Sequence, residues 1–277
     1  MDSRKRNNQF IPVQSKQEFA VFIQRMGEKK LKIPAKEVIR DPNFFPADID
    51  DLYRLYRLVR DTVVLSVIEY GAGWSTLALS QAIWENRENF CEEYIDQRNL
   101  NAFQLHTVDA SKYFLESALN RIPDSLQSVI SPRIAIPRLV SEGENCTVLW
   151  SPAQRVDYDL IYIDGPEPEQ VVRGEMDFPI SNIYDLPIMG DMVRYESYIL
   201  PSTLIMFDGR TSNYRHFKNH FSRDWISLSN FEKDYSLMYL NEDPIGSINK
   251  RHLSFREERA FVSLKEFKNW GLKLNEN

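Results

Sequence analysis

The stretch Val67-Ile-Glu-Tyr-Gly-Ala-Gly-Trp-Ser-Thr76 joins an apolar segment to a helical pattern through an acidic residue and two glycines. Residues 65–68 have the composition of a buried strand. The residues after the glycines have the spacing of one helix face: Trp74, Leu77, Ala78 and Ala82. The glycines are therefore predicted to stand at a strand-to-helix corner, where a ligand can lie against the main chain.

The groups at this corner suit a ligand that carries both an anionic part and a cationic or hydroxylated part. Gly71 can adopt φ values that side chains forbid, and Gly73 has no Cβ to keep a ligand away from the backbone. The N–H groups and the positive dipole end of the following helix favour an anion. Glu69 offers an acceptor for a cationic group or for hydroxyls. We interpret the stretch as a nucleotide-binding turn.

Composition narrows the class of protein. With 277 residues and 43% hydrophobic content, the chain can bury a core as one α/β domain with additions. It has no apolar run of about 18 residues and begins with a polar segment, so we expect a soluble, cytoplasmic protein without a membrane partner. A formal net charge of −6 disfavours nucleic acid as a partner. Cys91 and Cys146 form no disulfide or zinc pattern, and the oligomeric state is left open.

The rest of the chain predicts a doubly wound α/β fold. Apolar segments that end near Asp109, Asp164 and Asp208 alternate with helical patterns, which favours a mostly parallel, seven-stranded, Rossmann-like sheet. Residues 129–150 indicate a strand, a long turn and a returning strand, and residues 225–228 and 236–240 indicate an antiparallel pair.

The predicted division of the chain is into three parts. A capping box at residues 15–18 and a second helix from about Ala47 predict an N-terminal helical extension over residues 1–60. The Rossmann-like domain is expected over residues 61–242, and a charged tail that packs on or near it over residues 243–277. We expect residues 166–188 and the extension to cover the substrate side.

Four predicted strands end in an acidic residue, and in a parallel sheet their ends share one edge: Glu69, Asp109, Asp164 and Asp208. A single acidic residue at a strand end is often only a turn or cap residue, but acidic residues at the ends of four predicted strands indicate a ligand site.

These residues resemble the class I S-adenosylmethionine-dependent methyltransferases. The resemblance covers residues 64–240 and is carried by Glu69-Tyr-Gly-Ala-Gly73, by Asp109 and by Tyr162-Ile-Asp-Gly-Pro166, whose ending is similar to that of small-molecule O-methyltransferases. It implies S-adenosylmethionine as cofactor, with Glu69 and the turn backbone at its amino-acid end and Asp109 on both ribose hydroxyls. The implied cofactor-binding set is Glu69, Gly71, Ala72, Gly73, Ser75, Thr76, Asp109, Ala110 and Asp164.

The resemblance also implies how the acceptor is handled. The acceptor is expected to be a small molecule or a sugar, methylated at oxygen, with Asp164 or Asp208 taking its proton and Arg210 orienting an anionic substrate. Residues 134–140 offer no adenine contact of the usual kind. Asp208-Gly-Arg210 replaces the Asp-Asn pair of metal-dependent members, so a divalent metal is possible but not favoured.

Two other functions stay open. A nicotinamide-dependent oxidoreductase also uses a glycine turn, but Thr76 stands where its third glycine is expected and Asp109 lies too far along the chain for its ribose acid. A catalytically degenerate binding protein would keep the fold. His216 and His220 have helical ligand spacing, although a solvated helix face is the favoured interpretation over zinc.

Overall fold

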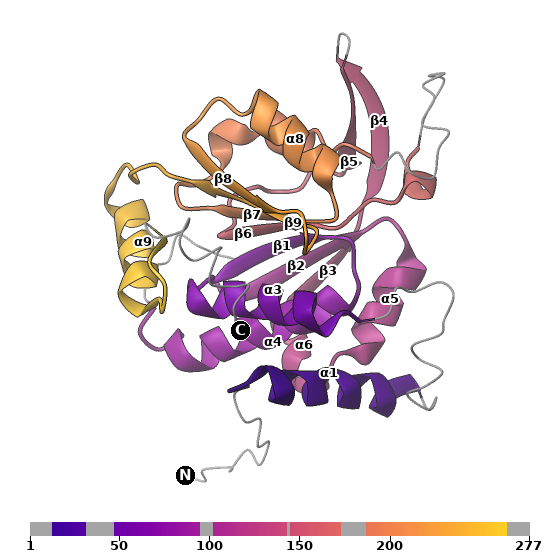
Figure 1. Ribbon diagram of the computed structural model, residues 1–277, viewed down its shortest axis with the longest axis vertical. Helices are drawn as coiled ribbons and strands as arrows, with labels where there is room; N and C mark the ends of the chain where they lie inside the picture. The colour runs from indigo at the N-terminus through magenta and orange to yellow at the C-terminus, as the bar shows by residue number, and fades with distance from the viewer. Residues whose placement is uncertain (1–12, 32–46, 95–101, 143–144, 173–186, 265–277) are drawn as a thin grey trace.

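The computed structural model describes residues 13–31, 47–94, 102–142, 145–172 and 187–264 (Figure 1). Its centre is a seven-stranded sheet in the order β3-β2-β1-β6-β7-β9-β8. The strands are β1 Ser66–Tyr70, β2 Gln104–Asp109, β3 Ile130–Ile134, β6 Leu160–Ile163, β7 Leu204–Asp208, β8 Trp225–Asn230 and β9 Tyr235–Leu240. β9 runs antiparallel to both β7 and β8, and the other pairs are parallel. The predicted fold class and the antiparallel closing pair are confirmed.

Helices cover both faces of the sheet (Figure 1). One face carries α1 Lys16–Leu31, α3 Ile49–Asp61, α4 Trp74–Phe90, α5 Lys112–Arg121 and α6 Asp124–Gln127. The other carries α7 Asp191–Arg194, the 3₁₀ turn η2 Glu196–Tyr198 and α8 Thr211–His220. A further 3₁₀ turn, η1 Pro168–Gln170, follows β6, and α9 Ser247–Arg259 lies at one side of the molecule.

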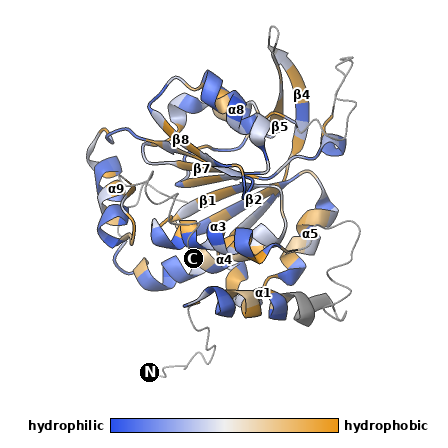
Figure 2. Ribbon diagram, viewed as in Figure 1, coloured by the Kyte–Doolittle hydropathy of each residue, from blue (hydrophilic) through white to orange (hydrophobic). Residues whose placement is uncertain are grey.

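The strands read as continuous apolar runs because both of their faces are buried. Every residue of β1 is buried, and successive apolar side chains of this strand point alternately into the two layers of the core. Val67 belongs to the layer under α3 and α4, whereas Ile68 belongs to the layer under α7 and α8. Figure 2 shows the corresponding apolar colour concentrated on the sheet and on the inner sides of its helices.

A two-stranded antiparallel sheet extends from the main one (Figure 1). It consists of β4 Ile136–Glu142 and β5 Asn145–Ser151, as the strand, turn and returning strand of the sequence predict. Residues 143–144 of that turn lie outside the described residues. Single parallel bridges from Arg138 to Val172 and from Val148 to Met189 attach the hairpin to neighbouring segments.

The two predicted N-terminal helices are present as α1 and α3. Asp48 caps α3 by accepting N–H bonds from Asp50 and Asp51 at 2.9 and 3.3 Å, and Leu55 and Val59 pack in the core beside α4. Since α3 shares the core of the sheet, nothing in the packing separates the three predicted parts, and their boundaries stay a prediction.

Two helical segments differ from the sequence prediction. The helix expected from Met192 to Ile199 is two short turns, α7 and η2, because the carboxylate of Glu196 turns to accept the backbone N–H groups of Ser222 and Arg223. Residues 247–259 of the predicted charged tail form α9, a helix that the sequence prediction does not specify. Among the described residues, no helix is long and apolar enough to cross a membrane.

Candidate functional site

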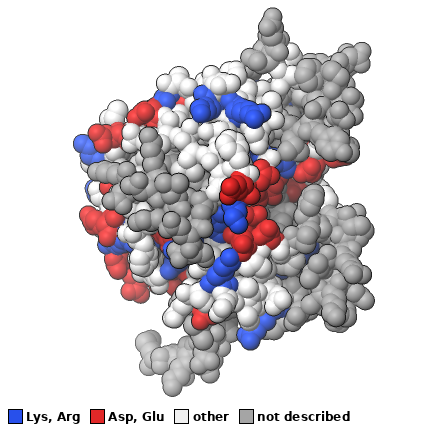
Figure 3. Space-filling view, in the orientation of Figure 1, with Lys and Arg blue, Asp and Glu red and all other residues white. Residues whose placement is uncertain are grey.

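A cavity of about 380 Å³ opens at the carboxyl ends of β1, β2, β6 and β7. Strand order reverses between β1 and β6, since β2 and β3 follow on one side and β7 on the other. Open α/β sheets bind ligands in the crevice at this reversal. Figure 3 shows acidic side chains gathered near the middle of the face in view. Asp109, Asp164 and Asp208, three of the four predicted strand-end acids, line the cavity.

The glycine turn between β1 and α4 has the backbone that its sequence predicts. Gly71 has φ +101°, and a Cβ added to it would lie 3.0 Å from the carbonyl carbon of Asp164. A Cβ at Gly165 would in turn lie 3.1 Å from the Cα of Gly71, so the two loops cross in close contact. At Gly73 an added Cβ would meet only the Ser75 Oγ, at 3.9 Å, and would project toward the cavity that Gly73 lines. The turn therefore leaves backbone exposed to a ligand.

Glu69 lies beneath this turn and fixes the start of α4. It is fully buried and accepts hydrogen bonds from the Ser75 hydroxyl at 2.6 Å and the Thr76 hydroxyl at 2.8 Å. The Thr76 hydroxyl also accepts the Gly73 N–H at 3.0 Å. Burial raises the pKa of Glu69 to about 7, although these hydroxyls oppose the shift. Glu69 does not line the cavity, and its contact with a ligand stays a prediction.

Asp109 joins the turn to the end of β2. Its carboxylate accepts the N–H groups of Ala72 at 2.8 Å and Ser111 at 2.6 Å, and the Gln170 amide at 3.4 Å. Burial raises its pKa in spite of these bonds. The backbone N–H of Ala110 adds to these bonds, so a ligand hydroxyl would have to share or replace one of them.

Asp164 and Asp208 form the acidic side of the cavity beside Tyr162. The Tyr162 hydroxyl donates to Asp208 Oδ2 at 2.7 Å. Desolvation, followed by repulsion from Asp208, raises the pKa of Asp164 well above its usual range, while its side chain stays 42% exposed. Burial likewise raises the pKa of Asp208. Of this pair, Asp164 has the carboxylate that a hydroxyl does not already occupy.

Arg210 holds the loop after β6 and does not line the cavity. Its guanidinium is 4% exposed and bonds to the carbonyls of Asp164 and Pro166 and to the Glu167 carboxylate, the last at 2.6 Å. These contacts hold the loop that carries Asp164 in place. The expected role of Arg210 in orienting an anionic substrate stays a prediction.

The sequence prediction did not name several residues of the cavity, although it expected the N-terminal extension and residues 166–188 on the substrate side. Residues 173–186 of that second segment lie outside the described residues. Asp48 and Asp51 reach it from the start of α3, where the sequence suggests only charges that complement the helix dipole. Phe114 and Gln170 reach it from α5 and η1, whereas none of residues 134–140 lines it. The side chains available beside an adenine therefore come from other elements than the end of β3.

Metal ligands do not converge in the part of the chain that the structure describes, where no group of three or more His, Cys, Asp or Glu side chains is placed to hold an ion. The His216 and His220 rings lie 4.1 Å apart on α8, and the His220 Nδ1 is 2.8 Å from the His216 carbonyl. Burial lowers the pKa of His216 to about 4.

Comparison with known proteins gives similarities of structure only. No protein-family model matches the sequence, and neither does any curated protein. The O-methyltransferase TomG from Streptomyces achromogenes, solved with SAM, is 11% identical over 80% of this chain and 89% of that one, with a TM-score of 0.42. An O-methyltransferase from Bacillus cereus, solved with SAH, is 12% identical over 82% and 100%, with a TM-score of 0.42. A methyltransferase from Geobacter sulfurreducens is 12% identical over 75% and 87%, with a TM-score of 0.43.

At these identities and scores, the similarities carry no conclusion about activity. The fold follows from the strand order and register of this chain itself. Fold and cavity together define a doubly wound, Rossmann-like protein with a cavity where its strand order reverses.

Proposed function

We propose that the protein binds S-adenosylmethionine in this cavity and transfers its methyl group to an oxygen of a small or sugar-type acceptor. The observation that carries the proposal is the cavity at the strand reversal, lined by the Gly71–Gly73 turn on one strand and by Asp109 at the end of the next.

The residues of the turn fit the cofactor. Gly73 leaves the volume of a side chain free on the cavity side, so the amino-acid end of the cofactor has room against the backbone and the first turn of α4. Asp109 would accept a ribose hydroxyl in exchange for one of its present hydrogen bonds, of which the bond from the Gln170 amide is the longest, at 3.4 Å. Ala72 and Ser75 line the cavity and complete the proposed contacts. Thr76 and Ala110 do not line it, so their contacts with a ligand stay predictions, as does that of Glu69, which holds the turn from below.

The acidic side of the cavity supports an acceptor rich in hydroxyl groups. Carboxylates accept hydrogen bonds from hydroxyls, and Asp48, Asp51, Asp164 and Asp208 line this side. Arg210 is engaged with the loop, so an anionic acceptor gains little from it. A hydroxylated, uncharged acceptor is therefore favoured over an acidic one.

Bound S-adenosylmethionine supplies an electrophilic methyl group, and the protein has to position the acceptor and take its proton. Asp164 is the better placed base, because its side chain lines the cavity, is 42% exposed and is not occupied by a hydroxyl of the protein. Tyr162 orients Asp208 beside it, and Arg210 positions the Asp164 loop.

Transfer of a labelled methyl group to a panel of sugars and hydroxylated small molecules tests this function. An Asp164→Asn variant should lose about 10²–10⁴-fold in kcat and much less in its affinity for S-adenosylhomocysteine. Asp157→Asn, at the opposite edge of the sheet, is the matched control. Turnover that survives in Asp164→Asn would refute the assigned base, whereas cofactor binding without turnover on any acceptor would favour a degenerate binding protein.

A further inference from the structure

A second cavity, larger than the first, lies at the opposite edge of the sheet. It has a volume of about 620 Å³ and is formed by the segments that precede β6 and β7 and by α9. The first cavity lies beyond the carboxyl ends of β6 and β7, so the length of these strands separates the two. A ligand in one does not occupy the other.

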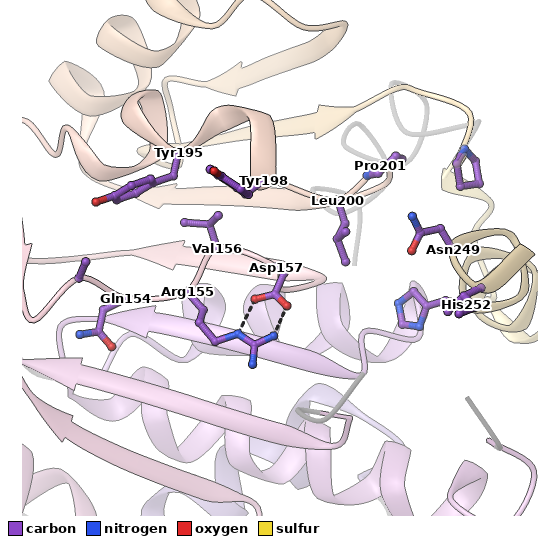
Figure 4. Close-up of a pocket in the computed structure, with 13 residues that line it drawn as sticks. Gln154, Arg155, Val156, Asp157, Tyr195, Tyr198, Leu200, Pro201, Asn249 and His252 are labelled. Atoms are coloured by element: carbon purple, nitrogen blue, oxygen red, sulfur yellow. Dashed lines mark hydrogen bonds and ion pairs between the residues drawn. The ribbon is translucent and has the colours of Figure 1, made fainter. Parts of the chain in front are cut away.

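The walls of this far-edge cavity combine apolar and aromatic side chains with a smaller number of polar and charged ones. Figure 4 shows Tyr195 and Tyr198 along one side, Leu200 beyond Tyr198, and Asn249 and His252 at one end. Ile248 from α9 adds to the apolar lining. Pockets of this size and character are typical of sites for small molecules.

The charged groups of the cavity neutralise one another. Arg155 Nε donates to Asp157 Oδ1 at 2.8 Å, as the dashed lines of Figure 4 mark. His252 has both ring nitrogens engaged, one with the buried carboxylate of Asp159 at 2.7 Å and the other with the Tyr94 hydroxyl at 3.0 Å. An ion entering the cavity would lose hydration without meeting an uncommitted opposite charge there, so an uncharged ligand is favoured.

Tyr195 and Tyr198 offer an aromatic face and a hydroxyl group to an uncharged ring-containing ligand. Tyr198 is 72% exposed and Tyr195 half-buried, and neither hydroxyl forms a hydrogen bond with another described residue. Their faces can stack on a flat ring, and their hydroxyls can bond to a ligand hydroxyl or carbonyl.

We propose that this far-edge cavity is a second binding site, which takes an uncharged, ring-containing small molecule that bears a hydroxyl or carbonyl group. It is separate from the proposed methyl-transfer site and does not depend on that function.

Ligand-detected NMR with naphthol as the probe tests the site. Naphthol should bind with a Kd of about 1 mM or tighter, and more tightly than the matching naphthoate. Saturating S-adenosylhomocysteine should not displace it. Ile248→Glu places a charge on the apolar wall and should weaken naphthol binding at least about tenfold. Ile245→Glu is the matched control, because Ile245 is 88% exposed and does not line the cavity.

Tyr198→Ala should also weaken binding, and its exposed position makes it the deciding variant if Ile248→Glu does not fold. The site is refuted if folded wild-type protein shows no naphthol signal at about 1 mM, if naphthoate binds better, if S-adenosylhomocysteine displaces naphthol, or if the wall variants bind as the Ile245→Glu control does.

Discussion

Gly71 and Gly73 stand two residues apart and perform different tasks. Gly71 is required by the fold, because its φ of +101° and its contact with the Asp164 backbone both exclude a side chain. At Gly73 the fold leaves room for a side chain, because a Cβ there meets almost nothing of the protein, and we propose that a ligand uses this room. Substitution by alanine at each position separates the two tasks.

We expect Gly71→Ala to lower the free energy of unfolding by about 2 kcal/mol or more, through strain and the 3.0 Å contact. Gly73→Ala should change stability by less than about 1 kcal/mol and weaken S-adenosylhomocysteine binding. Urea unfolding and calorimetric titration of both variants check these outcomes. Equal stability losses in the two would contradict the assignment.

Glu69 makes stability depend on pH in a defined direction. Its pKa of about 7 in the folded protein exceeds the ordinary value of 4.5, so the folded state binds the proton more tightly than the unfolded state. Its contribution is fully present below about pH 4.5 and is lost as pH rises to about 7.

The stability of wild type relative to Glu69→Gln should therefore fall by up to about 3 kcal/mol between pH 4.5 and 7. Unfolding of both proteins by urea at several pH values measures the difference, in which the other titrating groups cancel. A difference that is flat or rises over this interval would show that Glu69 is ionised when folded.

Helix α9 is an element for which the sequence shows no clear helical pattern of apolar residues. Arg256 is fully buried and reaches the buried carboxylate of Asp159 at 3.2 Å and the Val63 carbonyl at 3.2 Å. Burial opposes ionisation of Asp159, yet Arg256 and His252 hold its pKa well below the usual range. The helix is thus fixed by a buried ion pair with the segment before β6, together with Leu253 and Phe255, which pack against the core.

Arg256→Met should destabilise the protein by about 3–5 kcal/mol, because Asp159 would keep a buried charge without its main partner. Arg259→Met, on the same helix, should cost about 1 kcal/mol or less, since Arg259 pairs with Glu93, whose side chain is 56% exposed. Chemical unfolding compares the two. Similar losses in both variants would mean that the buried pair does not fix α9.

Prediction from sequence succeeds where a pattern is local. The buried strands, the β4–β5 hairpin and the glycine turn each carry their signal in a few consecutive residues. It gives no prediction for α9 and the wrong one for the segment α7–η2, whose polar contacts come from residues 97 and 26 positions away in the chain. Contacts between residues so far apart in the chain produce no periodic pattern of apolar residues from which they could be predicted.

At the scale of the whole molecule, the sheet predicts where strand-end acids gather but not what surrounds them. Asp109, Asp164 and Asp208 meet at the cavity because parallel strands end together. Asp51 and Phe114 join them through the packing of α3 and α5, which the sequence does not specify. Contacts proposed for the cofactor, the acceptor and the base remain predictions for experiment.

Binding of S-adenosylhomocysteine, measured by calorimetry on the purified protein, tests the central claim most directly. Wild type and an Asp157→Ala control should bind it alike, Asp109→Ala should bind at least about tenfold more weakly while remaining folded, and NAD should not bind. Folded wild-type protein that binds no S-adenosylhomocysteine, or that binds it equally well without the Asp109 carboxylate, would contradict the proposed cofactor site.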